Sequence, residues 1–266
     1  MVEHLRGKNA ATITQKEVDE YRNARLGEQT RRKTQPAPAT LDREIELLNR
    51  TLNYAVRCGK LPSNPIANVK LLRQPNVRRM VLREEQFSLL LEKASLELKP
   101  ILVVAYDTGM RKEEVLGLKW PQLDLKAGRL SLAPQDTKTE EGREIYLTER
   151  AVEALRLVPR DLRSDYVFVN PRTGQRWKEI RDQFAKACKE AGVVGLWFHD
   201  TRRSFVTNAR RRGVPESVVM RMSGHKTRAV FDRYNVIEAE DLKEAVRKIE
   251  NGLRQETRQV PKTGSA

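Results

Sequence analysis

Residues 223–236 read SGHKTRAVFDRYNV, and the interpretation of the whole chain depends on this stretch. It holds His225, one of three histidines in the protein, nine residues before Tyr234. Val230 and Phe231 lie four and three residues before Tyr234, so a helix would place all three on one apolar face. That spacing favours Tyr234 as a core side chain, because tyrosine is commonly at least half-buried. The alternative, that Tyr234 is a nucleophile, needs support from outside this stretch.

The composition indicates a folded, highly charged protein with a polyanionic partner. The 266 residues are 39% hydrophobic and 33% charged, enough for one large domain or two modest ones. Lysine and arginine total 51 against 36 acidic residues, a formal charge of +15. Such an excess favours nucleic acid, because phosphate contacts release counterions. An anionic membrane fits less well, since we find no lipidation motif or long basic amphipathic helix.

The distribution of apolar residues and cysteines predicts the compartment. No apolar run approaches the ~20 residues that span a bilayer. The N-terminal residues 1–15 lack the apolar core of a secretory signal. Cys58 and Cys188 are isolated, which gives no disulfide framework. We therefore expect a cytoplasmic protein without a membrane partner.

The first 78 residues are predicted to form a small helical module. Residues 14–26 form a short helix behind a threonine cap, and residues 40–60 form a longer one that ends at Gly59. The longer helix has apolar side chains at helical spacing, namely Leu41, Ile45, Leu48, Leu52 and Ala55. Between the helices lies a polar, basic loop. Its Arg31, Arg32 and Lys33 are candidate DNA contacts.

Residues 79–250 are predicted to form a second unit, joined to the first by a linker at 70–79 and followed by a polar tail at 251–266. Helices are expected at 80–95, 99–109, 148–157 and 177–191, and through most of the last 60 residues. Segments 128–133 and 143–147 are strand-like, and the basic turn 134–142 joins them as a hairpin. The predicted fold class is mainly α with a small antiparallel β-sheet (α+β).

Several basic motifs of the second unit could carry chemistry. In TGMRKEEVLGL, Arg111 and Glu114 share one face at a helix start. They form either a surface ion pair, which contributes little, or an arginine that Glu114 orients toward a phosphate. In FHDTRRSF, His199 and Arg202 are also three residues apart. His199 is either a structural histidine or a catalytic one.

Three further basic features complete the set. Nine basic residues lie between 202 and 233 against only Glu216 and Asp232, so this segment is predicted to be electropositive. Arg203, Lys226 and Arg228 are its candidate DNA contacts. Lys138 lies in the hairpin turn, where it is either a solvated surface group or an ammonium carried into a DNA groove. Gly224 is expected to end a helix that starts at Pro215, which leaves His225 in the turn before the helix of Tyr234.

Taken together, these residues resemble the tyrosine recombinase (phage integrase) family. The order and spacing of the motifs match over roughly residues 80–240, and the preceding helical module is similar to the family's core-binding domain. The matching residues are Arg111, Lys138, His199, Arg202, His225 and Tyr234. The chain departs from the family at Thr201, where many members have an apolar residue, and at Ser223, where a leucine often precedes Gly-His. Lys138 is preferred to Lys126 because it lies in the turn.

The resemblance implies a DNA strand-breaking and rejoining enzyme that acts at specific recombination sites of double-stranded DNA, integrating or excising a mobile element or prophage. Tyr234 would attack a phosphodiester and form a 3′-phosphotyrosyl intermediate. Arg111, Arg202 and His225 would hold the phosphate oxygens, His199 would be the general base, and Lys138 would protonate the leaving 5′-oxygen. Glu114 would position Arg111.

The resemblance also implies a clamp of two domains around DNA, a homotetramer assembled on DNA, and possible accessory DNA-bending proteins. Leu242, Val246, Ile249 and Leu253 form an apolar stripe that packs on its own domain or docks on a neighbouring protomer. No cofactor is expected, because covalent capture conserves the bond energy and no phosphate-binding glycine-rich loop is present. A zinc site of His199, His225 and Cys188 fails on ligand number and spacing.

Two rival functions are a type IB topoisomerase and a catalytically silent DNA-binding protein. The short chain and the separate helical module favour a recombinase over the topoisomerase. The complete set of motif residues argues against a silent protein.

Overall fold

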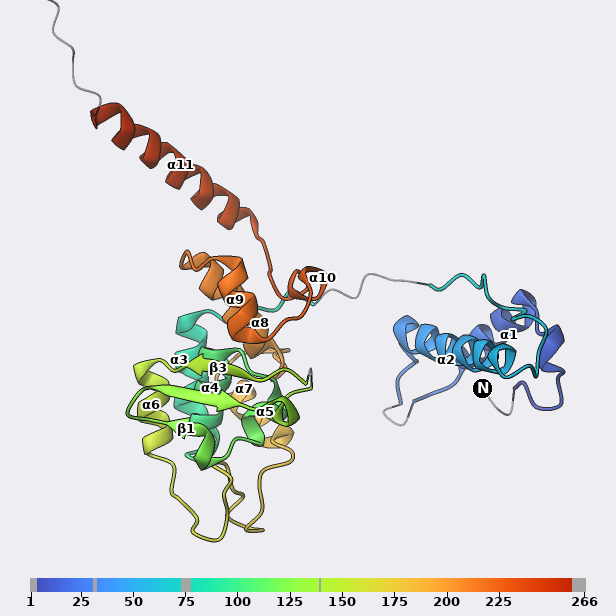
Figure 1. The fold of residues 1–266 in the computed structure, drawn as a ribbon, viewed down its shortest axis with the longest axis horizontal. Coiled ribbons are helices and arrows are strands. Elements are labelled where there is room, and N and C mark those ends of the chain that lie inside the picture. Colours follow the sequence, from blue (N-terminus) through green and yellow to red (C-terminus); the bar gives the residue numbers. More distant parts are fainter. Residues whose placement is uncertain (1–3, 31–32, 73–77, 139, 260–266) are drawn as a thin grey trace, which may run out of the picture. The chain divides into compact units, whose positions relative to one another are not determined.

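The structure is a computed structural model that describes residues 4–30, 33–72, 78–138 and 140–259, with side chains described through residue 251. The chain divides into two compact units, Met1–Arg78 and Arg79–Ala266. Figure 1 labels their α-helices and two of the strands, β1 and β3. Each unit is described by itself below.

The first unit is built on two helices, α1 (Gln15–Gly27) and α2 (Pro38–Arg57), after a short 3₁₀ turn, η1 (Ala10–Thr12). Thr14 and Glu17 cap α1 reciprocally, and the Thr14 backbone N–H donates to Glu17 Oε2 at 2.8 Å. Its apolar core is small and consists of Ile13, Val18, Tyr21, Ile45, Leu52 and Ile66. Both predicted helices are confirmed, and α2 begins early because Pro38 suits a first helical turn.

The second unit is built around one apolar helix, α4 (Leu98–Thr108). Its helices are α3 (Glu84–Lys93), α4 (Leu98–Thr108), α5 (Lys112–Leu116), α6 (Glu149–Arg156), α7 (Arg181–Glu190), α8 (Asp200–Arg211), α9 (Glu216–Ser223), α10 (Arg228–Phe231) and α11 (Ala239–Gln259). α4 is the central helix and packs against α6 and α8. Ile101, Leu102 and Val104 on α4 are almost fully buried. An all-round apolar sequence therefore makes α4 the centre of the core.

A small antiparallel sheet forms one side of this unit, in the order β1 (Leu123–Asp124), β2 (Arg129–Leu132) and β3 (Arg143–Tyr146). The short 3₁₀ turn η2 (Trp120–Gln122) precedes β1, and η3 (Pro134–Asp136) follows β2. Leu130 pairs with Ile145, and both are buried, as the two-residue side-chain period of a strand requires. The predicted hairpin is confirmed. β1 was not predicted, because two residues are too short for a periodic pattern.

An ion-pair cluster ties three helices of this unit together. Arg150 on α6 donates to Asp107 on α4, with 3.0 Å from Nε to Oδ2, and also bonds Glu84 on α3. Its guanidinium lies over the rings of Phe87 and Tyr106, which stack 3.8 Å apart. The ion pairs and the aromatic stack together fix the positions of α3, α4 and α6 relative to one another.

The fold class predicted from the sequence, mainly helical with a small antiparallel sheet, is confirmed. Three helix expectations are wrong in detail. α3 begins at Glu84, four residues after the expected start at 80. α7 begins at Arg181, four residues after the expected start at 177. α10 ends at Phe231, so Tyr234 lies in the turn that follows the helix. In the part of the chain that the structure describes, no helix combines the length and the apolar composition needed to cross a membrane.

Candidate active site

The site begins where α4 gives way to α5. Gly109 ends α4 with φ of 64°, and a Cβ there would lie 2.4 Å from the Phe205 ring, so only glycine fits. The turn places Arg111 at the N-cap of α5. The Arg111 guanidinium donates from Nη1 to Glu114 Oε1 at 2.9 Å and from Nη2 to the Gly224 carbonyl at 3.1 Å. Glu114 therefore orients Arg111, as its spacing predicted.

Glu114 is held from a second side by Arg143, the first residue of β3, a contact that sequence reasoning missed. Arg143 Nη2 lies 2.7 Å from Glu114 Oε2, and both side chains are buried. Burial raises the pKa of Glu114, but the hydrogen bonds and charges of Arg143 and Arg111 outweigh it, and the net pKa is lowered. The carboxylate is thus ionised between two guanidinium groups. The only sequence signal for Arg143 is its position at the end of the basic turn.

Arg202 on α8 is the most buried charge of the site, with 1% of its surface exposed. Its Nη1 donates to the carbonyls of Gly109, at 2.7 Å, and Ser223. Among the described residues its Nη2 has no hydrogen-bond partner and no carboxylate pairs with it. Burial and the neighbouring Arg111 lower the pKa of Arg202 to about 9. A buried guanidinium without a counter-ion is costly, so an anionic ligand would stabilise it.

Tyr234 and His199 are in direct contact. The Tyr234 hydroxyl lies 2.7 Å from His199 Nε2, at the N-cap of α8. Partial burial and the charge of Arg202 lower the pKa of His199, so the ring is neutral near pH 7 and its Nε2 can accept the phenol proton. The Tyr234 ring is also flanked by Arg202 and Arg203, whose guanidinium carbons lie 5.5 and 5.4 Å from its centroid.

The turn that carries Tyr234 is anchored to α8 of the same chain. Thr207 Oγ1 donates to the Tyr234 carbonyl at 3.0 Å and accepts from Val236 N at 3.1 Å. Arg210 Nε donates to Asn235 Oδ1 at 2.7 Å. Tyr234 lies in a turn and not in a helix, so these hydrogen bonds are what hold its hydroxyl beside His199.

The prediction that Val230, Phe231 and Tyr234 share one apolar helix face holds for Phe231 and Tyr234 but not for Val230. Phe231 is fully buried and packs with Val219 and Val206, and Tyr234 is partly buried against the same cluster. Val230 is 42% exposed. The helical spacing fails there because α10 ends before Tyr234.

His225 follows the helix end that Gly224 makes, with φ of 71° at the glycine. Its ring is buried, its centroid lies 4.7 Å from that of Tyr234, and its Nδ1 lies 2.7 Å from Ser223 Oγ. Burial and the charges of Arg202 and Arg111 lower the pKa of His225 to about 3. Its Nε2 is buried and has no hydrogen-bond partner among the described residues.

Lys138 lies apart from these side chains. It is exposed in the β2–β3 connection, and its ammonium has no hydrogen bond or ion pair to the described residues. The same end of the hairpin reaches the site through Arg143 and through an ion pair of 3.1 Å between Lys226 and Glu141. Lys126 lies in the turn between β1 and β2, at the other end of β2. Four strand residues separate those ends by about 13 Å. Lys138 therefore fits the site better.

The candidate DNA contacts fall into different surroundings. Arg31 and Arg32 lie outside the described residues, and Lys33 is exposed. Arg203 does not lie on an exposed surface as expected: it is buried, with its Nη1 2.6 Å from Asp200 Oδ1. The excess of basic residues between 202 and 233 predicted an exposed side chain, but the Tyr234 ring covers the Arg203 guanidinium at 5.4 Å. Lys226 and Arg228 are exposed, and each is paired with a carboxylate.

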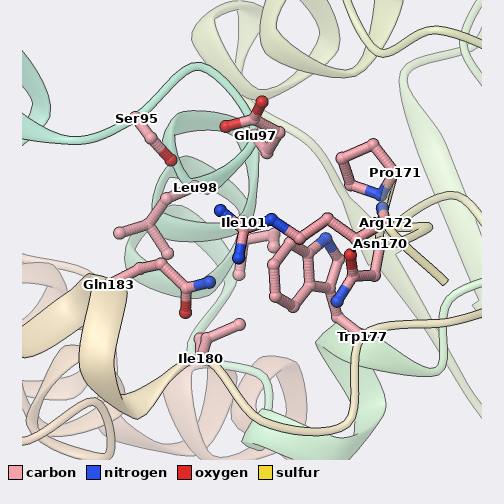
Figure 2. Close-up of a pocket in the computed structure, with 10 residues that line it drawn as sticks. All are labelled: Ser95, Glu97, Leu98, Ile101, Asn170, Pro171, Arg172, Trp177, Ile180 and Gln183. Carbon is pink, nitrogen blue, oxygen red and sulfur yellow. Dashed lines mark hydrogen bonds between the residues drawn. The ribbon is translucent and has the colours of Figure 1, made fainter.

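Of the hollows in the described second unit, one adjoins the site and another lies away from it. A groove of about 790 Å³ runs between the β2–β3 hairpin and the end of α9 and is lined by Arg143, Arg221, Gly224 and His225, among others. A cavity of about 240 Å³ lies elsewhere, between the start of α4, residues 170–177 and α7 (Figure 2). None of the residues around Tyr234 lines this second cavity.

Comparisons with known proteins agree with this arrangement. Residues 70–240 match the model of the phage integrase family. A shufflon-specific DNA recombinase of Escherichia coli is 29% identical over 88% of this chain and 61% of its own length. The integrase of Salmonella phage P22 is 24% identical over 81% of this chain and 58% of its own length. The chain thus spans about three fifths of the length of these curated relatives.

Solved structures show the same fold. A lambda integrase (75–356) dimer bound to a COC′ core site has a TM-score of 0.68 and 16% identity, over 90% of this chain and 89% of that one. XerH, in a post-cleavage complex on its palindromic difH substrate, has a TM-score of 0.65 and 19% identity, over 88% of this chain and 72% of that one. The family resemblance read from the motifs is confirmed.

Proposed function

The chain belongs to the phage integrase family, and from that premise we propose that it is a site-specific DNA recombinase that cuts and rejoins strands through a 3′-phosphotyrosyl link to Tyr234. One observation carries the proposal. Around a tyrosine hydroxyl that is already bonded to a neutral histidine lie two buried polar atoms without partners among the described residues, Nη2 of Arg202 and Nε2 of His225. A phosphodiester oxygen would accept a hydrogen bond from Arg202 Nη2, and from His225 Nε2 when that nitrogen carries a proton.

The cleavage step uses these groups in order. His199 Nε2 takes the proton of the Tyr234 hydroxyl, the phenolate oxygen forms a bond to phosphorus, and the bond from phosphorus to the 5′-oxygen breaks. Arg111 and Arg202 stabilise the negative charge that develops on the non-bridging oxygens. Rejoining is the reverse reaction with the 5′-hydroxyl of another strand, which needs no added energy source.

Lys138 is assigned to protonate the departing 5′-oxygen. The assignment rests on the hairpin that carries Lys138. Two of its residues contact the site: Arg143 pairs with Glu114, and Glu141 pairs with Lys226. Lys138 is exposed and unpaired within the described residues, so its ammonium is free to reach a strand lying over the site.

The nucleophile acts on DNA held by its own chain. His199 and the anchoring Thr207 are on α8, and both contact the turn of Tyr234 within one polypeptide. The partner is double-stranded DNA carrying recombination sites, which suits a charge of +15, and the lambda and XerH structures were determined on such DNA. The helical module of residues 1–78 is proposed as the core-binding domain that closes on the duplex with the catalytic domain. In a cell the reaction would integrate or excise a mobile element or prophage.

A homotetramer on DNA is proposed from α11. The acidic start of this helix is tied to α8 by Arg211 and Asp241, with 2.8 Å between Nε and Oδ1. Beyond it Leu242, Val246 and Ile249 are 62%, 53% and 63% exposed; Leu253, the fourth member of the predicted stripe, has no described side chain. An exposed apolar stripe that does not pack on its own domain fits docking on a neighbouring protomer. Removing residues 240–266 should then abolish tetramers on DNA and spare binding to one half-site; intact tetramers would contradict the docking.

The decisive experiment traps the covalent intermediate. The protein is incubated in EDTA with a pool of nicked duplexes of randomised sequence, and denaturation-resistant adducts are recovered and sequenced. Wild-type protein should yield adducts enriched in one sequence, and Tyr234→Phe should yield none while still shifting DNA in gels. Tyr166→Phe is the matched control, a partly buried tyrosine away from the site, and should keep the adduct. An adduct that survives Tyr234→Phe contradicts the mechanism, and relaxation of plasmids of any sequence would indicate a topoisomerase instead.

A further inference from the structure

Ser223 has a side chain in three close polar contacts. It is the last residue of α9 and is fully buried. Its Oγ lies 2.6 Å from the carbonyl oxygen of Val219, 3.3 Å from that of Met220, and 2.7 Å from His225 Nδ1. One hydroxyl carries one proton, so it cannot donate to both a carbonyl and the imidazole.

The short contact to Val219 decides where that proton lies. A carbonyl oxygen can only accept, and two oxygens at 2.6 Å without a proton between them repel each other. The Ser223 hydroxyl therefore donates to Val219, and its lone pairs face His225. The 2.7 Å contact to His225 is then a hydrogen bond in which Nδ1–H donates to Ser223 Oγ. Ser223 thus fixes the tautomer of His225.

This tautomer leaves Nε2 of the neutral ring as a bare acceptor. That atom is buried and has no hydrogen-bond partner among the described residues. Burial and the nearby arginines keep the ring neutral, since they lower the pKa of His225 to about 3. The charged and titratable groups around the ring come from every neighbouring element: Arg111 and Glu114 of α5, Arg143 of β3, His199 and Arg202 of α8, Arg221 of α9, Glu141 of the hairpin and Tyr234.

A neutral ring of this kind cannot donate to a phosphate oxygen, because the nitrogen that is free to do so has no proton. We propose that Ser223 couples anion binding at this site to the uptake of one proton by His225 Nε2. With a phosphodiester bound, Nε2–H donates to the anion, Nδ1–H donates to Ser223, and the Ser223 hydroxyl still donates to Val219. The proton comes from solvent. This inference rests on the proposed function, in which the anion bound at the site is a DNA phosphodiester.

Ser223 is also joined to the other anion-binding group. Its backbone carbonyl accepts from Arg202 Nη1, while its side chain accepts from His225. One residue therefore positions both the arginine and the histidine that flank Tyr234, and it acts on the anion only through them. Ser223 is a positioning residue. The leucine that many family members have here could not set the tautomer in this way.

The test observes the three histidines directly by NMR of the full chain labelled in the imidazole nitrogens, with His4→Gln and His199→Gln variants to assign the signals. The free protein should show His225 protonated at Nδ1 only. Proton on Nε2 alone overturns the proposal without touching the recombinase assignment, since this state is read without DNA or cleavage.

Sulfate is the probe for the anion, because it stays fully ionised across the pH range used. On titration with sulfate, His225 should gain a proton at Nε2, and calorimetry in two buffers of different ionisation enthalpy should report about one proton taken up. Sulfate affinity should fall about tenfold per pH unit as pH rises from the pKa of the free ring, about 3, to the pKa of the bound ring. A ring that stays neutral throughout the titration overturns the proposal.

Two alanine variants separate coupling from structure. Ser223→Ala frees His225 to carry its proton on Nε2, so sulfate affinity should lose its pH dependence and proton uptake should vanish. Ser204→Ala removes another buried serine hydroxyl with the same bond to the carbonyl four residues earlier, 2.7 Å from Ser204 Oγ to Asp200 O. That hydroxyl accepts from the backbone N–H of Leu82 at 2.8 Å and has no histidine contact. The Ser204→Ala variant should behave as wild type. Equal pH dependence in Ser223→Ala and wild type overturns the role of Ser223.

Discussion

Arg143 should be as important to the site as the arginines that the motifs reveal, and replacing it with methionine tests this. The change removes the hydrogen bonds of 2.7 and 3.4 Å from Arg143 to Glu114 and leaves a carboxylate with 4% of its surface exposed beside Arg111 alone. Breaking a buried ion pair costs roughly 3–5 kcal/mol. Because Glu114 keeps its two bonds to Arg111, the lower end applies, a loss of about 3 kcal/mol in the free energy of unfolding.

The assay is equilibrium unfolding in urea, with Arg129→Met as the matched control. Arg129 lies on the neighbouring strand, pairs with Glu144 at 3.5 Å, and is 45% exposed, so its loss should cost less than about 1 kcal/mol. Glu114→Gln combined with Arg143→Met should be less destabilising than the sum of the single changes, by about 1–3 kcal/mol.

The same variant has a consequence for cleavage. Glu114 orients Arg111 only while its own position is fixed from both sides, and a shift of about 1 Å at a catalytic group can lower the rate about 100-fold. Adduct formation on nicked DNA should fall by that order in Arg143→Met and stay unchanged in Arg129→Met. If the two variants unfold within about 0.5 kcal/mol of each other, the buried ion pair does not have the role assigned to it.

Gly224→Ala should lower the urea midpoint more than Gly213→Ala: both have positive φ, 71° and 85°, which costs alanine about 1–2 kcal/mol, but only at Gly224 would the Cβ meet a neighbour, Arg143 Cζ at 2.9 Å. Because the folded pKa of His225, about 3, lies below its ordinary value, the unfolded chain binds the extra proton in acid. The free energy of unfolding should therefore fall as pH drops from about 6.5 toward 3, by up to about 1.4 kcal/mol per unit, and His225→Gln should flatten that slope; equal slopes would contradict it. Burial raises the pKa of the Cys188 thiol to about 11, whereas Cys58 is exposed, so Ellman's reagent should label Cys188 at least ~100-fold more slowly, and Cys58→Ser should remove the fast phase.

The sequence by itself determined the elements with strong local signals and the residue types of the site. Thr14, Gly109 and Gly224 mark helix ends through a side-chain cap or a positive φ, which are properties of the residue and its neighbours. The contact of Arg111 with Glu114 was also predictable, because three residues of helix set their distance. The order of the basic motifs then identified the family.

The tertiary structure decided which of these residues meet. Arg143 and Glu114 are 29 positions apart, so no local pattern predicts their contact. In the sequence Ser223 is only a serine at the end of a helix, and the structure shows that its hydroxyl lies between Val219 and His225. Local spacing misled at Tyr234, where the turn after α10 is held by Thr207 on another helix. The excess of basic residues misled at Arg203, which is buried. Charge, tautomer and burial depend on neighbours distant in sequence, so residue types could name a nucleophile in SGHKTRAVFDRYNV, but only packing could show what holds it.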